Sequence, residues 1–224
     1  MPDGREEISV KVVTKISDIP AADWDACAGD ENPFVSHAFL NALEQSGSVS
    51  DRNGWLPQHL MIEDENGQAA ACMPIYLKNN SYGEYIFDWG WADAYERAGG
   101  KYYPKLQAAV PFTPATGPRM LVREGAPERY YDVLIAGMIQ LARQHDVSSL
   151  HVTFPLEGEW LRLGEAGFLQ RTSKQFHWKN KGYETFDDFL GELNSRKRKA
   201  IKKERRQVAE QGIELYPVTG ADLT

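Results

Sequence analysis

Two runs with strand-forming patterns flank a short turn in the first third of the chain. The runs are WLPQHLMIED (55–64) and QAAACMPIYLK (68–78), and Asn66-Gly67 lies between them. Asn-Gly is the dipeptide that best tolerates positive φ angles at both central residues of a tight hairpin turn. The sequence therefore predicts a β-hairpin at this point, and the rest of the fold must accommodate it.

Helical and extended patterns alternate around this hairpin. Glu128–Asp146 is the clearest helix, because its apolar side chains recur at i, i+3, i+4, i+7 and i+11 and form one stripe. Further helices are expected at 21–28, 36–46, 91–99, 158–166, 186–193 and 194–211, and further strands at 8–16, 82–88, 105–112, 148–154, 169–178 and 212–218. This order favours an α/β or α+β fold with helices on both faces of a sheet.

The same pattern predicts a division of the chain. Residues 1–193 contain one complete set of strands and helices, residues 194–211 form a basic linker helix, and residues 212–224 start a second unit that is cut off. We expect the chain to be the N-terminal part of a longer protein.

Composition excludes several classes of protein. With 42% hydrophobic and 25% charged residues in 224 positions, the chain is typical of a soluble globular protein rather than a disordered one. No apolar run approaches the ~20 residues that span a bilayer, and the start MPDGREEISV lacks the pattern of a signal peptide. Cys27 and Cys72 form no CxxC pair, and free thiols in a reducing cytoplasm are the simpler interpretation, with one disulfide between them as the alternative. No metal-binding spacing such as HExxH is present, so no metal site is predicted.

Charge is concentrated in one short segment. Residues 196–206 (RKRKAIKKERR) carry eight Lys/Arg and one Glu, whereas the remaining residues carry 17 Lys/Arg against 31 Asp/Glu. On a helix, Arg198, Lys202 and Arg206 share a face, because they are spaced four residues apart. They are candidate contacts for the phosphates of a nucleotide, coenzyme A or tRNA. A solvated connecting helix is the alternative.

A proline-rich loop separates an expected strand from the long helix. Residues 110–119 (VPFTPATGPR) contain three prolines and a glycine, which continue neither a helix nor a strand. A loop between a strand and a helix can direct backbone N–H groups at an anion, and Thr113, Thr116 and Arg119 would add donors. The segment matches neither GxGxxG nor a Walker loop. A rigid connection stiffened by proline is the alternative.

Aromatic residues and two histidines supply the remaining candidates. Large rings cluster from Phe87 to Tyr103, close to Asp88 and Lys105, and they either line a substrate cleft or fill the core. His177, between Phe176 and Trp178, is a candidate general base, and His151 is a weaker one. Either histidine can instead be a hydrogen-bonded structural residue.

Two long segments carry a resemblance to a known family. FDWGWADAYERAGGKYYPKLQAAVPFTPATGPRML (87–121) and QFHWKNKGYETFDDFLGELNSRKRKAIKKERR (175–206) resemble the FemAB-like predicted N-acyltransferases. These bacterial proteins are related to GNAT acetyltransferases and to Fem-type peptidoglycan aminoacyl ligases. The resemblance covers nearly the whole chain. It implies a GNAT-like α/β fold with a mixed, mainly antiparallel sheet, as the first half of a tandem GNAT-like protein.

The resemblance also implies an activity. A member of this family transfers an acyl or aminoacyl group from acyl-CoA or aminoacyl-tRNA to an amine, and a peptidoglycan precursor is one such acceptor. No covalently bound cofactor is implied, and the missing C-terminal half is an implied partner. The loop at 110–119 lacks the Arg/Gln-x-x-Gly-x-Gly/Ala pattern of a GNAT pyrophosphate loop. The expected role of this N-terminal half is therefore to bind the acceptor. The half alone is expected to be inactive.

Each candidate residue then has an expected role. His177 is the proton-transfer candidate, and the phosphate contacts are those of the basic helix. The substrate-binding candidates are the acceptor contacts Trp89, Trp91, Tyr103 and Lys105 and the cleft-loop residues Phe112, Thr113, Gly117 and Arg119. Two other functions stay open: a non-catalytic GNAT-like module that binds tRNA or a protein partner, and a purely structural interaction domain.

Overall fold

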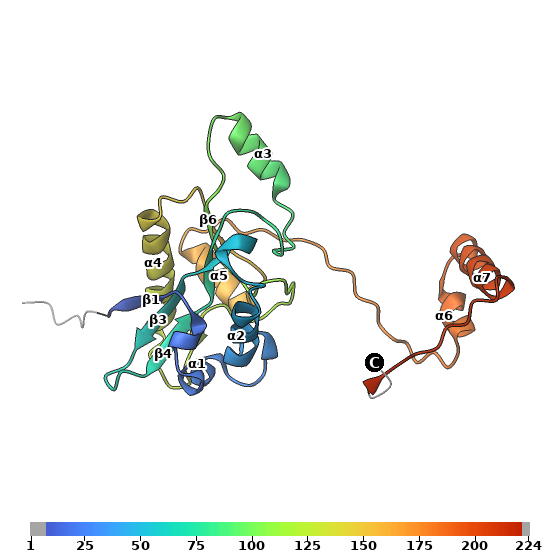
Figure 1. The fold of residues 1–224 in the computed structure, drawn as a ribbon, viewed down its shortest axis with the longest axis horizontal. Helices are drawn as coiled ribbons and strands as arrows, with labels where there is room; N and C mark the ends of the chain where they lie inside the picture. Colours follow the sequence, from blue (N-terminus) through green and yellow to red (C-terminus); the bar gives the residue numbers. More distant parts are fainter. Residues whose placement is uncertain (1–7, 221–224) are drawn as a thin grey trace, which may run out of the picture. The chain divides into compact units, whose positions relative to one another are not determined.

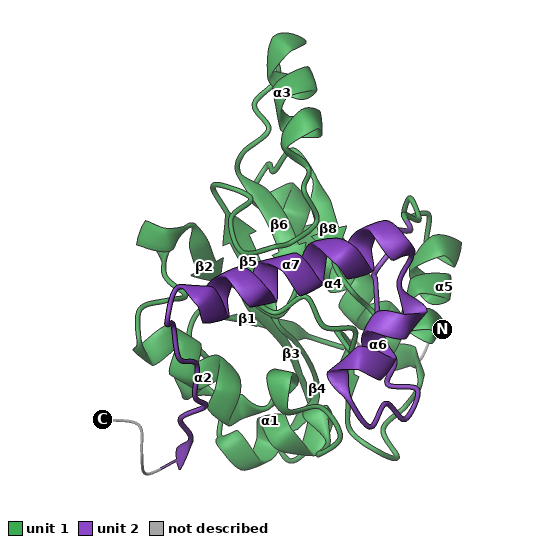
Figure 2. Ribbon diagram, turned by 90° about the vertical axis from the view of Figure 1, so that its right-hand side faces the viewer, with its two compact units in different colours: residues 1–171 green, residues 172–224 purple. Residues whose placement is uncertain are grey.

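The computed structural model describes residues 8–220, and the chain divides into two compact units. Unit 1 ends at Arg171 and unit 2 begins at Thr172 (Figure 2). The sequence patterns instead grouped residues up to 193 with the first domain. The predicted limits 1–193, 194–211 and 212–224 stay a prediction, and the last four residues lie outside the described part of the chain.

Unit 1 contains two four-stranded sheets. The first has the order β1 (Val10–Val13), β3 (His59–Glu63), β4 (Ala69–Met73) and β7 (Leu121–Val122), and the second has the order β2 (Trp55–Pro57), β5 (Ile75–Lys78), β6 (Lys105–Ala108) and β8 (Leu150–Val152). All neighbouring strands are antiparallel except β6 and β8, which are parallel. The sheets meet at Gln58 and Pro74, the single residues between β2 and β3 and between β4 and β5.

The predicted hairpin is confirmed, with a wider turn than expected. Strands β3 and β4 pair across it, and β2 and β5 continue the pairing into the second sheet. Only Gly67 takes a positive φ, +78°, and the register shifts between Ile62 and Glu63. The Asp64 carboxylate accepts hydrogen bonds from the Asn66 and Gln68 N–H groups and closes the loop. The turn is therefore a bulged loop rather than a two-residue turn.

Helices cover both faces of the first sheet (Figure 1). The helices of unit 1 are α1 (Ala21–Ala28), α2 (His37–Gln45), α3 (Trp89–Arg97), α4 (Arg129–Gln144) and α5 (Glu157–Glu165), with short 3-10 turns at Ile16–Asp18, Pro33–Val35 and Asp51–Asn53. In β4, Met73 packs with Leu134 of α4, whereas Cys72 packs with Trp24 of α1 and Leu40 of α2. The expected fold class, a mixed and mainly antiparallel α/β fold with helices on both faces, is confirmed.

Three expected strands are absent from the described residues. In 82–88, Gly83, Tyr85 and Phe87 have φ angles of +77°, +59° and +51°, which an extended strand does not allow. Segments 169–178 and 212–218 form no strand, and no neighbouring strand pairs with them. Their apolar side chains are exposed, so the alternation in the sequence does not correspond to a buried face.

Unit 2 contains two capped helices, α6 (Phe186–Glu192) and α7 (Ser195–Glu210). Thr185 and Asp188 form a capping box at the start of α6, and the Asn194 side chain accepts from the Lys197 N–H at the start of α7. The predicted basic helix is thus confirmed. In the described part of the chain, no helix has the length and apolar character needed to cross a membrane.

Candidate functional site

Four charged side chains are buried together where β5 and β6 meet the segment that leads into α3. Lys78, Glu84, Asp88 and Lys105 are exposed by 0%, 3%, 0% and 0%, and we call them the ionic cluster. Charges this deeply buried are rare unless they are paired and hydrogen-bonded. Lys105 Nζ donates to Ser81 Oγ at 2.8 Å, to Glu84 Oε2 at 2.7 Å and to Asp88 Oδ2 at 2.6 Å. All three ammonium protons of Lys105 are therefore used.

Strand pairing explains why two lysines meet in the interior. Lys78 ends β5 and Lys105 starts β6, and the antiparallel register places them directly opposite each other. Like charges at such a position repel. The segment between β5 and α3 supplies the two carboxylates that offset this repulsion.

Lys78 is the least paired member of the ionic cluster. Its Nζ donates to the Tyr82 carbonyl oxygen at 3.2 Å, lies 3.8 Å from Glu84 Oε1, and lies 3.5 Å from the centre of the Trp55 ring. Burial is the main reason that the pKa of Lys78 falls to about 7. The charges of Glu84 and Asp88 oppose this fall, and the charge of Lys105 adds to it. Near neutral pH this amine therefore exists in both protonation states.

The two carboxylates differ in their electrostatics. Burial raises the pKa of Asp88, but hydrogen bonds from Lys105 and Tyr102 outweigh burial and hold the pKa at about 2. Burial also raises the pKa of Glu84, and Lys105 offsets only part of that rise. Glu84 Oε1 and Asp88 Oδ1 are buried and have no hydrogen-bond partner. Buried polar atoms are normally satisfied, so two such oxygens in one cluster indicate an incomplete set of contacts.

The proline-rich loop lies beside this cluster. Strand β6 ends at Ala108 and β7 begins at Leu121, so residues 109–120 leave the sheet between two strands that pair with the same hairpin. The Phe112 N–H donates to the Gly83 carbonyl oxygen, and the Phe112 ring lies 5.7 Å from that of Trp55. The loop thus contacts the segment that carries Glu84 and the ring that covers Lys78.

The polar groups of the loop are used within the protein. Arg119 is fully buried, and its guanidinium donates to the carbonyl oxygens of Thr153, Gly117, Pro118 and Ala115 at 2.8–3.1 Å. The Gly117 N–H donates to Phe154, and the Thr113 hydroxyl donates to Pro111. Their predicted contact with a substrate stays a prediction, because in this structure these donors hold the loop in place.

A carboxylate receives the backbone N–H groups next to the loop. Glu159 Oε1 accepts from the Arg119 N–H at 2.8 Å and from the Met120 N–H at 2.6 Å, and its Oε2 accepts from the Leu156 N–H at 3.1 Å. Burial raises the pKa of Glu159, and these three hydrogen bonds oppose the rise. Glu159 therefore fastens the end of the loop to the start of α5.

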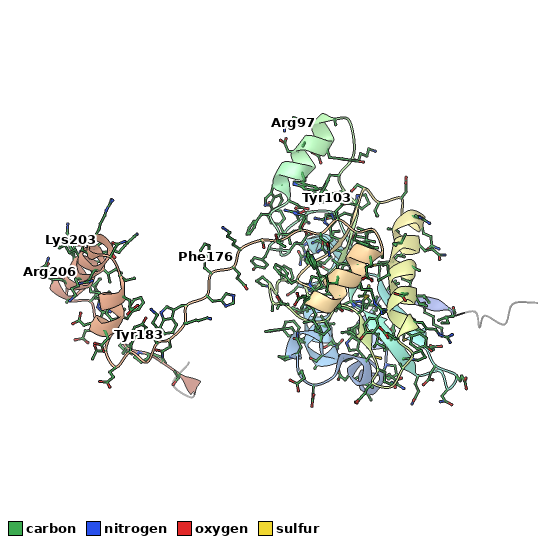
Figure 3. All side chains as sticks on the ribbon, turned by 180° about the vertical axis from the view of Figure 1, so that it is seen from behind. Arg97, Tyr103, Phe176, Tyr183, Lys203 and Arg206 are labelled. Atoms are coloured by element: carbon green, nitrogen blue, oxygen red, sulfur yellow. The ribbon has the colours of Figure 1, made fainter. Side chains whose placement is uncertain are left out.

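Several predicted acceptor contacts come together at the ionic cluster. Lys105 belongs to it, and the Tyr103 hydroxyl lies 2.8 Å from Ser81 Oγ. Trp89 is 44% exposed, and its ring packs against that of Tyr82, whose carbonyl oxygen binds Lys78. Figure 3 shows Tyr103 where the chain returns from α3 to the sheet and Arg97 at the far end of that helix.

Other predicted residues do not join this group. Trp91 is 55% exposed, with the Arg171 guanidinium 4.9 Å from its ring centre. His151 on β8 bonds Ser149 Oγ at 2.8 Å, and burial lowers the pKa of His151 to about 4. His177 belongs to unit 2, is exposed rather than on a strand, and bonds the side chain of Gln175.

All three predicted phosphate contacts of the basic helix take part in interactions within unit 2. Arg198 donates to the carbonyl oxygens of Leu190, Gly191 and Leu193, which terminate α6. Lys202 pairs with Asp187 at 2.8 Å, and Arg206 lies 3.7 Å from Glu210. Phosphate binding by these three residues stays a prediction.

Sequence reasoning missed Lys78 and Glu84. A signal was present, because Lys78 ends a run of otherwise apolar residues (AAACMPIYLK) in which a lysine is unusual. Glu84 and Asp88 follow within ten residues, but only the fold brings them to the lysines. Within residues 8–220, no group of three or more His, Cys, Asp or Glu side chains is arranged to hold a metal ion.

Comparisons with known proteins place this arrangement in context. The FemAB-like family, described as peptidoglycan biosynthesis/recognition, matches residues 15–224. No curated protein matches the chain.

Three solved structures that resemble it are acetyltransferases. One is an acetyltransferase of Trypanosoma brucei, with 11% identity and a TM-score of 0.46, over 78% of this chain and 100% of the other. The second is a ribosomal-protein-alanine N-acetyltransferase of Brucella melitensis biovar Abortus, with 9% identity and a TM-score of 0.45 over the same shares. The third is an aminoglycoside 6'-N-acetyltransferase of Acinetobacter baumannii, with 15% identity, a TM-score of 0.42, and coverage of 79% and 100%.

Proposed function

Because the chain belongs to the FemAB-like family of peptidoglycan biosynthesis and recognition, we propose that it is an N-acyltransferase that transfers an acyl or aminoacyl group to an amine. The observation that carries this proposal is the Lys78 amine, which is buried in the ionic cluster beside the proline-rich loop. Acyl transfer to nitrogen needs a group that removes a proton from the acceptor ammonium, and such a group works best when its pKa lies near the working pH. The pKa of Lys78, about 7, meets that requirement.

The proposed reaction uses Lys78 as the proton acceptor. Neutral Lys78 Nζ takes one proton from the acceptor ammonium, which leaves a nitrogen lone pair. This nitrogen attacks the carbonyl carbon of the donor, a C–N bond forms, and the C–S bond of a thioester or the C–O bond of an aminoacyl ester breaks. The leaving thiolate or alkoxide takes the second proton of the nitrogen. Lys78 then returns its proton to solvent, so that protons and charges balance.

We also propose a donor and an acceptor. The donor is acyl-CoA or aminoacyl-tRNA, and the acceptor is an amine of a peptidoglycan precursor; the family description, peptidoglycan biosynthesis/recognition, supports the peptidoglycan part of this proposal. The proposed compartment is the bacterial cytoplasm, and the free thiols of Cys27 and Cys72 agree with it. The notion that the chain is the first half of a tandem protein remains part of the proposal.

The test is a transfer assay on the full natural protein and on residues 1–224, which are expected to be inactive alone. Acetyl-CoA, a long-chain acyl-CoA and aminoacyl-tRNA are offered with a peptidoglycan precursor, and released thiol or deacylated tRNA is measured. Lys78→Met should lower kcat about 100-fold or more, the usual contribution of a general base. Lys101→Met, which removes an exposed lysine after α3, is the matched control and should keep the wild-type rate. An unchanged kcat in Lys78→Met would remove Lys78 from the reaction.

A second candidate is a non-catalytic module that binds tRNA. One face of α7 carries Arg196, Lys199 and Lys203, and no ion pair joins them to an acid within the described residues. Figure 3 marks Lys203 and Arg206 on this helix. Binding of tRNA that weakens steeply with salt, without any acyl transfer, is the behaviour expected of such a module.

A further inference from the structure

We propose that the ionic cluster is a binding site for a primary ammonium ion, which Glu84 and Asp88 accept and whose arrival expels the proton of Lys78. The inference rests on the proposed function for the identity of this ligand as the acyl acceptor. It concerns binding, so it can be tested without an acyl donor.

The ionic cluster has more hydrogen-bond acceptors than donors. Lys105 uses all three of its protons, and each carboxylate binds it through one oxygen only. The other oxygens, Glu84 Oε1 and Asp88 Oδ1, are buried and accept nothing. A buried acceptor left without a donor is destabilising. A primary ammonium brings three N–H donors, which is the chemistry that these oxygens lack.

Charge in the cluster favours a cation once Lys78 is neutral. With both lysines protonated and both carboxylates ionised, the four side chains sum to zero. Loss of the Lys78 proton then leaves one net negative charge in a buried site. An incoming ammonium restores neutrality, so the ligand and the Lys78 proton compete for the same carboxylates. By thermodynamic linkage, protonation of Lys78 must lower the affinity for the ammonium ligand by the same factor as the bound ligand lowers the affinity of Lys78 for its proton.

Most of the neighbouring groups keep one charge state near neutral pH; for Glu84, burial raises the pKa, and Lys105 and Lys78 oppose the rise. The ionisable groups that face Lys78 or Lys105 are Glu84, Asp88, Tyr102, Tyr103 and His151. Burial raises the pKa of both tyrosines, and burial lowers the pKa of His151 to about 4, so these three side chains are neutral at pH 6–8. The pKa of Asp88 is held at about 2, which keeps it ionised.

Aromatic rings complete the surroundings of the cations. Lys78 Nζ lies over the Trp55 ring, and Lys105 Nζ lies 5.5 Å and 5.8 Å from the ring centres of Tyr102 and Tyr103. Such faces attract any cation, including quaternary ammonium. The unpartnered oxygens add a requirement for N–H donors, so the site should prefer a primary ammonium.

Calorimetry on the full chain tests this inference with n-propylammonium chloride and tetramethylammonium chloride as probes. Propylammonium should bind more tightly than tetramethylammonium. Its affinity should rise about tenfold from pH 6 to pH 8, as the Lys78 proton ceases to compete. In two buffers of different ionisation enthalpy at pH 6, binding should release close to one proton. Absence of propylammonium binding, equal binding of both probes, or absence of proton release would each overturn the inference.

Variants separate the contributions. Glu84→Gln should weaken propylammonium binding at least tenfold, whereas Asp93→Asn, which changes an exposed carboxylate on α3, should leave it unchanged. Lys78→Met should still bind propylammonium, but without proton release and with equal affinity at pH 6 and pH 8. If Glu84→Gln does not fold, the Lys78→Met variant and the comparison of the two probes on the wild-type chain still test the inference.

The results also separate this inference from the proposed function. Acyl transfer that depends on Lys78 without propylammonium binding would overturn this inference alone. Binding with proton release but without transfer would overturn the proposed function alone.

Discussion

The Phe112 N–H donates a hydrogen bond of 3.0 Å to the Gly83 carbonyl oxygen, and this contact joins the proline-rich loop to the segment that carries Glu84 and Asp88. A Cβ atom built on Gly83 would lie 2.5 Å from the Phe112 ring. Gly83 also has a φ of +77°, which side-chain-bearing residues seldom adopt. Position 83 therefore requires glycine for two independent reasons.

Gly83→Ala should destabilise the protein by about 2–4 kcal/mol, since it adds a steric collision to an unfavourable backbone conformation. Urea denaturation measures the change. Gly99→Ala is the matched control, because Gly99 has a φ of +87° but open space around its Cβ position. It should cost only about 1 kcal/mol for the backbone conformation. Equal losses in the two variants would mean that the Phe112 ring moves aside freely.

Arg119→Met should lower the free energy of unfolding by about 3 kcal/mol or more, because it leaves several buried carbonyl oxygens without donors. The matched control is Arg97→Met, at a guanidinium that is 72% exposed and paired with Asp93. This control should change stability by less than about 1 kcal/mol. Chemical denaturation of both variants decides the role of Arg119. A stable Arg119→Met protein with weakened substrate binding would instead support the substrate contact that the sequence suggests.

The stability of the wild-type protein should rise with pH above 7 through Lys78. The pKa of Lys78 is about 7 in the folded state against 10.5 in its ordinary state. Between these values the unfolded chain binds the extra proton, so the contribution of Lys78 to stability grows by up to about 1.4 kcal/mol per pH unit. Below pH 7 that contribution is constant. Lys78→Met should reduce the slope between pH 7 and pH 9, as measured by urea denaturation, and an unchanged slope would contradict the lowered pKa.

The exposed face of α7 should determine any binding of tRNA. Lys199→Ala and Lys203→Ala should each reduce the salt dependence of binding, log K against log salt, by about one unit. Lys202→Ala should have less effect, because Asp187 already pairs with that ammonium. Filter binding at several salt concentrations gives the slopes. The same reduction in all three variants would show that the Lys202–Asp187 pair opens to the ligand.

Local patterns in the sequence predicted the local parts of the fold. The hairpin around Gly67 and the long helix α4 were predictable because turn residues and apolar periodicity act over short distances. The expected strand at 82–88 was wrong, because Tyr85 and Phe87 adopt positive φ angles that their residue types do not suggest. A pattern of alternating apolar residues does not reveal such a backbone conformation.

The candidate site was predictable only in part. Lys105, Tyr103 and Phe112 were recognisable as a basic and aromatic group near one loop, and the fold brings them to one place. The pairing of Lys105 with Lys78 depends on strand register, and the approach of Glu84 depends on a loop that closes over both. These contacts join residues about 20 or more positions apart, and no single segment of the sequence encodes them.

The burial of strand β4 on both of its faces limits the insertions and deletions that this protein can tolerate during evolution. Ala71 and Met73 point to one hydrophobic core, and Cys72 points to the other. Gain or loss of a single codon within this strand would turn every following side chain to the opposite face and would mismatch two cores in one event. Descendants of this gene should therefore vary in length at the surface loops, while the residue count of β4 stays the same.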